Sequence, residues 1–220
     1  MENLYFAEFI IFDLDGVLIN SAPVTRKAAK IALEEIGIDS SEIDFSPYVG
    51  TGEKNFISGP CKMFGKEDSI PSATENFYKL YRENLCEMEV FPSTFPLLAE
   101  LAKLPVKLAI ASSSAKEKLL ASLSAAGIEP HRFDVIISGD DVAEKKPSPV
   151  IYQLAMERLG AAPESTLICE DAISGVTAAK GSGAFCLAIT TSFKKEDLLS
   201  VGADHVTDNI FDILNFVRKE

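Results

Sequence analysis

Five short, almost continuously apolar segments recur along the chain. They are residues 9–12, 106–110, 135–137, 167–169 and 185–189. Strands covered on both faces, as in a parallel sheet, have this composition because neither face meets water. Segments with helical patterns lie between them, at residues 116–126, 149–159 and 173–180, and glycines follow these helices at positions suited to end them. This alternation predicts an α/β fold with a doubly wound parallel sheet.

The interval from Ser21 to Met88 breaks the alternation. Apolar residues recur there at helical spacing, in residues 28–36 and 77–85, and we find no convincing buried strand. The simplest interpretation is an all-helical cap of residues 21–88, inserted after the first strand and closed by the turn around Phe91. Residues 1–20 and 89–220 would then form the α/β core.

Composition narrows the class of protein and its partners. Hydrophobic residues make up 47% of the chain and charged residues 25%, which is typical of a soluble globular protein. The formal net charge of −12 would repel the phosphates of nucleic acid and of anionic membranes, so we expect neither as a partner. A small phosphorylated metabolite would need local positive charge, from a divalent cation or a well-placed lysine. Monomer and homodimer both stay open.

The four cysteines show neither a CxxC pair nor the spacing of a zinc site. Cys169 and Cys186 lie within apolar segments, where a thiol acts as a small core residue. Reduced thiols favour a cytoplasmic location, and we expect neither a signal peptide nor a membrane span. Residues 2–6 resemble most of a tobacco-etch-virus protease site, with Ala7 in place of its glutamine, and we assign them no function.

Polar residues directly follow four of the apolar segments. They are Asp13-Leu14-Asp15-Gly16, Ser112-Ser113-Ser114, Gly139-Asp140-Asp141 and Glu170-Asp171. Ligands of open α/β sheets bind at the carboxyl ends of the strands, so we expect the site there. A lone aspartate is often a turn residue, but two aspartates flanking one residue before a glycine are more specific. The third group is more typical of a solvated turn, and the serines could simply cap a helix.

Four motifs in order along the chain resemble those of the haloacid dehalogenase superfamily, in its phosphatase and phosphomutase branches. The first is Phe12-Asp13-Leu14-Asp15-Gly16-Val17-Leu18, and the others are residues 111–114, 145–149 and 170–176. Each motif alone is of weak to moderate specificity, but four in order at four strand ends are a strong signal. The resemblance spans nearly the whole chain and extends to phosphoglycolate phosphatases. It implies a Rossmannoid core with an inserted helical cap.

The resemblance also implies a phosphoric monoester hydrolase that acts through an aspartyl phosphate. Asp13 would be the nucleophile, and Asp15 would act as general acid and base. Ser112 and Ser113 would bind the phosphoryl group, with backbone amides of the following helix as further donors. Lys146 would offset negative charge on Asp13 and on the transferring group.

Mg²⁺ is the cofactor that the resemblance implies, because two anions do not approach a phosphate dianion unaided. Its ligands would be the carboxylates of Asp13 and Asp171, the backbone carbonyl of Asp15, and Glu170 directly or through water. Oxygen ligands of this kind are those that magnesium prefers.

Residues 49–54 resemble the substrate-specificity loop of C1-type caps, although an ordinary turn between helices is the alternative. Thr51, Gly52, Glu53 and Lys54 would then contact the leaving group. β-Phosphoglucomutases have a lysine and an arginine in this loop, where this chain has Val49 and Glu53. The loss of two cations favours a phosphatase, phosphoglycolate phosphatase-like in its general pattern, over a phosphomutase.

The same loop bears on the leaving group. Glu53 would disfavour a second anionic group in the substrate unless Lys54 or Arg26 compensates, which leaves a neutral or amine-bearing leaving group open. True dehalogenation is disfavoured because hydrolytic dehalogenases of this fold lack an acid at the Asp15 position. A non-enzymatic binding module is disfavoured because all four motifs are intact.

Overall fold

A six-stranded parallel sheet forms the centre of the computed structural model, which describes residues 6–217 and therefore leaves most of the protease-site-like stretch outside the described residues. Its strand order is β5-β4-β1-β6-β7-β8. The strands are β1 (Phe9–Phe12), β4 (Lys107–Ala111), β5 (Val135–Ile137), β6 (Thr166–Glu170), β7 (Phe185–Ile189) and β8 (His205–Thr207). The predicted α/β fold with a parallel sheet is confirmed.

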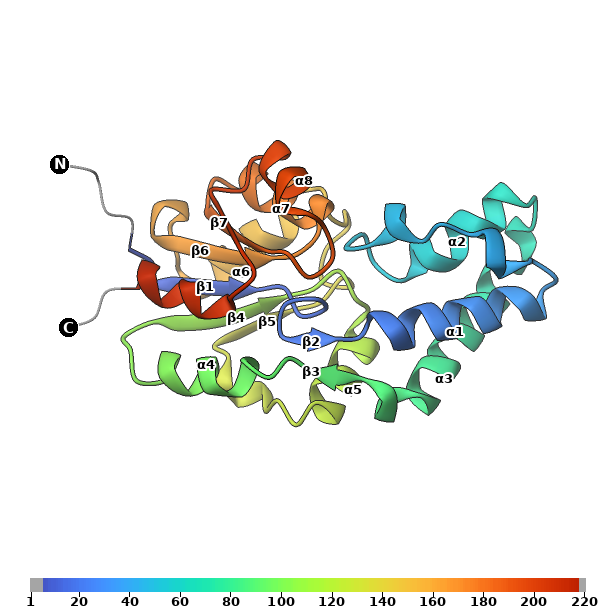
Figure 1. Ribbon diagram of the computed structural model, residues 1–220, viewed down its shortest axis with the longest axis horizontal. Helices are drawn as coiled ribbons and strands as arrows, with labels where there is room; N and C mark the ends of the chain where they lie inside the picture. Colours follow the sequence, from blue (N-terminus) through green and yellow to red (C-terminus); the bar gives the residue numbers. More distant parts are fainter. Residues whose placement is uncertain (1–5, 218–220) are drawn as a thin grey trace.

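Two apolar layers cover the two faces of the sheet. Figure 1 shows the helices that lie on either side of it. In β1, Ile10 and Phe12 belong to one layer and Ile11 to the other, because successive side chains of a strand point to opposite faces. Helices α4 (Thr94–Leu101) and α5 (Lys116–Ala125) and the 3₁₀ segment η7 (Ile210–Phe216) pack on the first face. Helices α6 (Val150–Leu159), α7 (Ile173–Gly181) and α8 (Lys195–Ser200) pack on the second. The sheet is doubly wound.

The sequence analysis did not predict three of the strands. β8 is a three-residue edge strand in which only Val206 is buried. β2 (Ile19–Asn20) and β3 (Glu89–Val90) form a two-residue antiparallel ladder. Strands this short present too few apolar positions to show a period, so only their partners in space identify them.

Helices α1 (Ala22–Glu35), α2 (Lys54–Met63) and α3 (Ile70–Glu83) lie between β2 and β3 and enclose an apolar core of their own. Figure 1 shows them beside the sheet domain, joined to it through the β2–β3 ladder. The short 3₁₀ segments are η1 (Ser40–Glu42), η2 (Ser46–Tyr48), η3 (Glu67–Ser69), η4 (Leu85–Glu87), η5 (Pro130–Arg132) and η6 (Pro163–Ser165). We keep residues 21–88 as the proposed cap, because the ladder marks the points where the chain leaves and rejoins the core.

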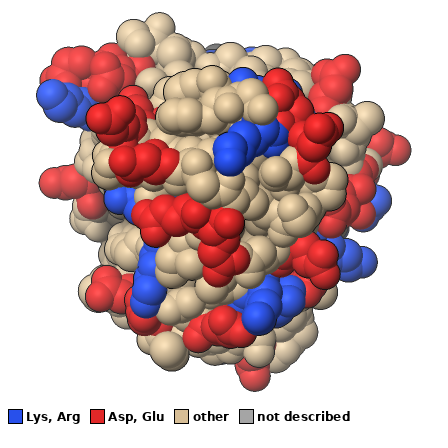
Figure 2. Space-filling view, turned by 90° about the vertical axis from the view of Figure 1, so that its right-hand side faces the viewer, with Lys and Arg blue, Asp and Glu red and all other residues tan. Residues whose placement is uncertain are grey.

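Acidic side chains are spread over the face at the cap end of the molecule, with basic side chains scattered between them (Figure 2). A phosphorylated ligand approaching this face meets a negative field, so compensating charge has to lie within the site itself. No helix among residues 6–217 combines the length and the apolar composition needed to cross a bilayer.

Candidate active site

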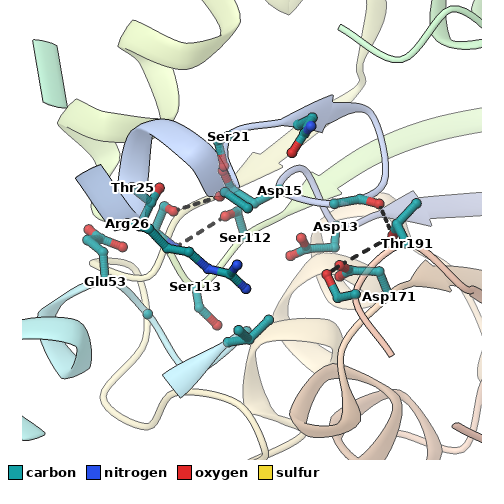
Figure 3. Close-up of a pocket in the computed structure, with 18 of the residues that line it drawn as sticks. Asp13, Asp15, Ser21, Thr25, Arg26, Glu53, Ser112, Ser113, Asp171 and Thr191 are labelled. Carbon is teal, nitrogen blue, oxygen red and sulfur yellow. Dashed lines mark hydrogen bonds between the residues drawn. The ribbon is translucent and has the colours of Figure 1, made fainter. Parts of the chain in front are cut away.

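The register of the sheet brings the polar strand ends together. Phe12 of β1 pairs with Ile110 of β4 and with Cys169 of β6, so the residues that follow these strands lie at one edge. A cavity of about 550 Å³ opens there between the core and the proposed cap (Figure 3). Of the predicted site residues, its wall contains Asp13, Asp15, Ser112, Ser113, Asp171, Gly52 and Glu53.

Lys146 is buried beside the predicted nucleophile. Its Nζ atom lies 2.6 Å from Oδ1 of Asp13 and 2.6 Å from Oε1 of Glu170. It also stands over the ring of Tyr152, 4.7 Å from the centroid. Burial alone would lower the pKa of Lys146, but the two carboxylates outweigh it and raise this pKa above its ordinary value. The lysine therefore stays cationic against Asp13.

Glu170 holds this lysine in place. One carboxylate oxygen accepts from Lys146 and from the hydroxyl of Tyr152, and the other accepts from the amides of Asp171 at 3.0 Å and Ala172 at 3.2 Å. Both oxygens are engaged within the protein, and Glu170 does not line the cavity. Of the two predicted forms of metal contact, direct or through water, these bonds favour the one through water.

Asp171 is 3% exposed and lines the cavity. Ser192 and Thr191, on the loop after β7, both donate to its Oδ2 atom, Thr191 at 3.5 Å. A Cβ atom on Gly16, whose φ is +86°, would lie 1.9 Å from that oxygen. The glycine of the first motif thus serves two purposes, because it allows both the turn out of β1 and the approach of Asp171.

The electrostatics at this edge favour a bound cation. Burial raises the pKa of Asp13 to about 7, although Lys146 opposes the shift, and the pKa of Asp171 rises through burial and through the charges of Glu170 and Asp13. Two buried carboxylates that face one cavity are the oxygen donors that Mg²⁺ prefers. Within residues 6–217, no three His, Cys, Asp or Glu side chains form a metal-binding group, and the predicted set takes its third ligand from the backbone of Asp15.

Asp15 has partners that the sequence did not reveal. Its carboxylate accepts from Lys118 Nζ at 3.0 Å, from Ser114 Oγ at 2.9 Å and from the hydroxyl of Ser21. Burial would raise the pKa of Asp15, but the Lys118 charge and the hydrogen bonds hold it below its ordinary value. Lys118 also lies over the ring of Tyr81 in α3, 4.8 Å from the centroid. The only sequence signal was helical spacing, since Ser114 and Lys118 are four residues apart.

The three serines at residues 112–114 make different contacts. Ser114 bonds Asp15 as well as preceding α5, and its amide donates to Ser112 Oγ at 3.2 Å. Ser113 Oγ is buried in the cavity wall without a hydrogen-bond partner among the described residues, so it is available to a ligand. The predicted amide donors are occupied instead, because the amides of Ala115 and Lys116 donate to Glu53 and Asp140.

The loop after η2 closes one side of the cavity. Ser174 of α7 donates to the carbonyl of Val49 at 3.2 Å, which ties the loop to the core. Thr51 bonds within the loop, to Tyr48 and Asn55, and Lys54 is exposed. Neither Thr51 nor Lys54 lines the cavity, so local bonding and solvent take the place of the substrate contacts predicted for these two residues.

Helix α1 and the residue before it supply wall residues outside the four motifs. Thr25 is buried and Arg26 is exposed, and both line the cavity together with Ser21 (Figure 3). Their position just after the first strand was visible in the sequence, but a helical pattern does not show which turn faces a ligand.

Comparison with known proteins identifies the family. The family model for haloacid dehalogenase-like hydrolases matches residues 10–189. The chain is 34% identical over 208 residues to the chloroplastic protein SUPPRESSOR OF QUENCHING 1 of Arabidopsis thaliana, covering 93% of this chain but only 20% of that protein. It is also 34% identical to the phosphorylated carbohydrates phosphatase of Thermotoga maritima, over 80% of this chain and 82% of that one.

A solved structure agrees with this assignment. CbbY from Rhodobacter sphaeroides in complex with phosphate superposes with a TM-score of 0.80 at 29% identity, over 94% of this chain and 96% of that chain. The region that the family model matches contains all four motifs and the helices between β2 and β3. The chain belongs to the haloacid dehalogenase-like hydrolases.

Proposed function

We propose that this hydrolase is a Mg²⁺-dependent phosphatase that cleaves a small phosphorylated metabolite through an aspartyl phosphate on Asp13. One observation carries the proposal: Asp13 stands at the end of the central strand, against the buried cation Lys146, and lines a cavity that also contains Asp171. Ser112 and Ser113 line the cavity beside Asp13, and their hydroxyl groups can donate hydrogen bonds to the oxygens of a phosphoryl group.

The metal would be held by the carboxylates of Asp13 and Asp171 and by the backbone carbonyl of Asp15. When bound, Mg²⁺ would supply positive charge to the attacking carboxylate and to the phosphoryl oxygens. Lys146 would supply a second, permanent positive charge, since Glu170 and Tyr152 hold it against Asp13. Ser113 Oγ, which has no hydrogen-bond partner within residues 6–217, would donate to a phosphoryl oxygen.

The contacts of Asp15 support a proton-transfer role at the leaving oxygen. Lys118 keeps this carboxylate ionised, which is the form that takes a proton from water during hydrolysis of the aspartyl phosphate. To act first as an acid, Asp15 must acquire a proton and weaken its bond to Lys118. Because Asp15 and Lys118 both line the cavity, a ligand can reach this pair directly.

The similarity to a Thermotoga phosphatase of phosphorylated carbohydrates, and to a protein solved with phosphate, supports the reaction class. A phosphomutase was the alternative. Transfer between two positions of a sugar bisphosphate needs cations at both ends of the cavity, whereas the loop presents Val49, Gly50, Gly52 and Glu53 to it. A cytoplasmic location is proposed because all four cysteines are free thiols.

The test is Mg²⁺-dependent release of inorganic phosphate from an aryl phosphate by the wild type and by Asp13→Asn. We expect D13N to lose at least about 1,000-fold in kcat, because single removal of a nucleophile has effects of this size or larger. Chelation of Mg²⁺ should abolish wild-type turnover, and added Mg²⁺ should restore it.

Asp140→Asn is the matched control. It makes the same change at the end of β5, where Asp140 accepts from the Lys116 amide and does not line the cavity. D140N should keep wild-type turnover. Equal activity of D13N and D140N would contradict the assignment of Asp13 as nucleophile.

A further inference from the structure

Glu53 is the one acidic side chain that the proposed cap contributes to the cavity wall among the described residues. It is 4% exposed, and its Oε2 atom is buried without a hydrogen-bond partner within the described protein. A buried acceptor left unpaired costs about 1–3 kcal/mol, and more when it is charged. Because Glu53 lines the ligand cavity, we expect its unpaired oxygen to accept a hydrogen bond from a donor on the ligand.

The hydrogen bonds of Oε1, the other oxygen of Glu53, determine which of the two oxygens stays unpaired. Oε1 accepts from the hydroxyl of Tyr78 at 2.7 Å and from the amide of Ala115 at 2.8 Å. Tyr78 belongs to α3 and Ala115 precedes α5 of the core, so the carboxylate is clamped between the two parts of the molecule. Oε2 is thereby held in one place and does not exchange roles with Oε1.

Nearby cations are committed elsewhere. Lys118 donates to Asp15 and Ser114, and Lys145 donates to the carbonyl of Gly139. Arg26 lines the cavity but is exposed, so water screens its charge more than that of the buried Glu53. Lys118 and Lys145 still interact with the charge of Glu53 at longer range, but within residues 6–217 neither forms an ion pair with it. An anionic group on the leaving group would therefore meet a desolvated carboxylate without a bonded cation, whereas a hydroxyl or an ammonium group would satisfy it.

We propose that Glu53 selects the leaving group: the enzyme acts on small monophosphates whose leaving group carries a hydrogen-bond donor, and it rejects those that carry a second anion. This inference rests on the proposed phosphatase function and adds the substrate class. The phosphoryl end of the ligand would lie on Asp13 and Ser113, and the donor end would lie on Oε2 of Glu53. Because Ala115 of the core holds Oε1, this selection depends on contact between the cap and the core.

The test uses phosphate esters that differ only at the terminal group: hydroxyalkyl, aminoalkyl, plain alkyl and carboxyalkyl phosphates of two, three and four carbons. We compare kcat/KM of the wild type and of Glu53→Gln with Mg²⁺ present. Because Tyr78 and Ala115 both donate to the Oε1 position, the glutamine carbonyl should occupy it and place the NH₂ group where Oε2 was. The substitution therefore turns an acceptor into a donor without changing size.

We expect the wild type to prefer the hydroxyl or ammonium esters over the carboxylate esters, and E53Q to reduce that ratio by about 10-fold or more, as for the loss of a charged hydrogen bond. The hydroxyl and ammonium series distinguish a neutral donor from a cationic one. Glu117→Gln is the matched control, because it removes the exposed 2.5 Å ion pair between Glu117 and Arg82 of α3, outside the cavity. E117Q should keep the wild-type ratio.

Two results would overturn the inference: a wild-type preference for the carboxylate esters, or the same ratio in E53Q as in the wild type. The first needs no variant, so it holds even if E53Q fails to fold. Failure of the proposed function would look different, because the wild type would then release no phosphate from any ester of the series.

Discussion

The core edge and the cap face of the same cavity differ in how their charged side chains are paired. At the core edge, acidic and basic groups are buried in contact: Lys146 joins Asp13 to Glu170, and Lys118 bonds Asp15. The cap face presents backbone, apolar side chains, the polar residues Ser21, Thr25 and Arg26 and, among the described residues, one carboxylate, that of Glu53, with an unpaired oxygen. Paired charges at the core edge fix one geometry for one reaction, while a cap wall without such pairs leaves room to choose the ligand.

Lys146→Met tests the core side of this comparison and should have the largest effect. Removing the lysine leaves Asp13 and Glu170 buried without their shared cation, which we expect to lower the free energy of unfolding by about 3–5 kcal/mol. Turnover should fall by about 100-fold or more, as when a preorganised charge is removed from an active site. Chemical denaturation and a phosphate-release assay measure the two effects. A stable variant with normal turnover would show that the network is dispensable.

Lys118→Met should have an intermediate effect, of about 2 kcal/mol at neutral pH, because Asp15 is only partly buried. The pKa of Asp15 is depressed in the folded state below the ordinary 3.8, so its pairing stabilises the protein above that pH and is lost as pH falls through the folded value. The stability difference between wild type and K118M should therefore shrink below about pH 4. A difference that is constant from pH 7 to pH 3 would contradict the pairing.

Gly50→Ala tests the cap side and should have the smallest effect. Gly50 has a φ of +77°, and a Cβ atom there would lie 2.5 Å from Ser174 Oγ and 2.6 Å from Ala172 Cβ. We expect the loop to move off the core, with a kcat/KM about tenfold lower, which corresponds to about 1.4 kcal/mol. Gly65→Ala is the control: its φ is +66° and its Cβ would meet nothing within 4 Å.

Both alanine variants should lose about 1–2 kcal/mol of stability, since each places a side chain in the left-handed region. Only G50A should lose activity, because only its loop borders the cavity. Equal kinetics in G50A and G65A would show that contact between the loop and α7 does not matter for catalysis. Thermal unfolding and steady-state kinetics decide between these outcomes.

The sequence predicted best where a pattern repeats or a motif is contiguous. The apolar segments gave the central strands within a residue or two, and the strand-end rule placed Asp13, Ser112 and Asp171 at one edge. The sequence said less where the role of a side chain depends on partners from other segments. Glu170 carries a motif position, yet its oxygens bind Lys146, Tyr152 and two amides.

Local sequence determined the longer elements of this protein, their order and the candidate reacting groups, because hydrophobic period and strand-end polarity are properties of neighbouring residues. Tertiary structure decided which charges meet. The resemblance implied that Lys146 lies against Asp13, whereas only packing showed that Lys118 bonds Asp15. Likewise, no local pattern distinguishes the clamped oxygen of Glu53 from its unpaired one, since the clamp comes from Tyr78 and Ala115, distant along the chain.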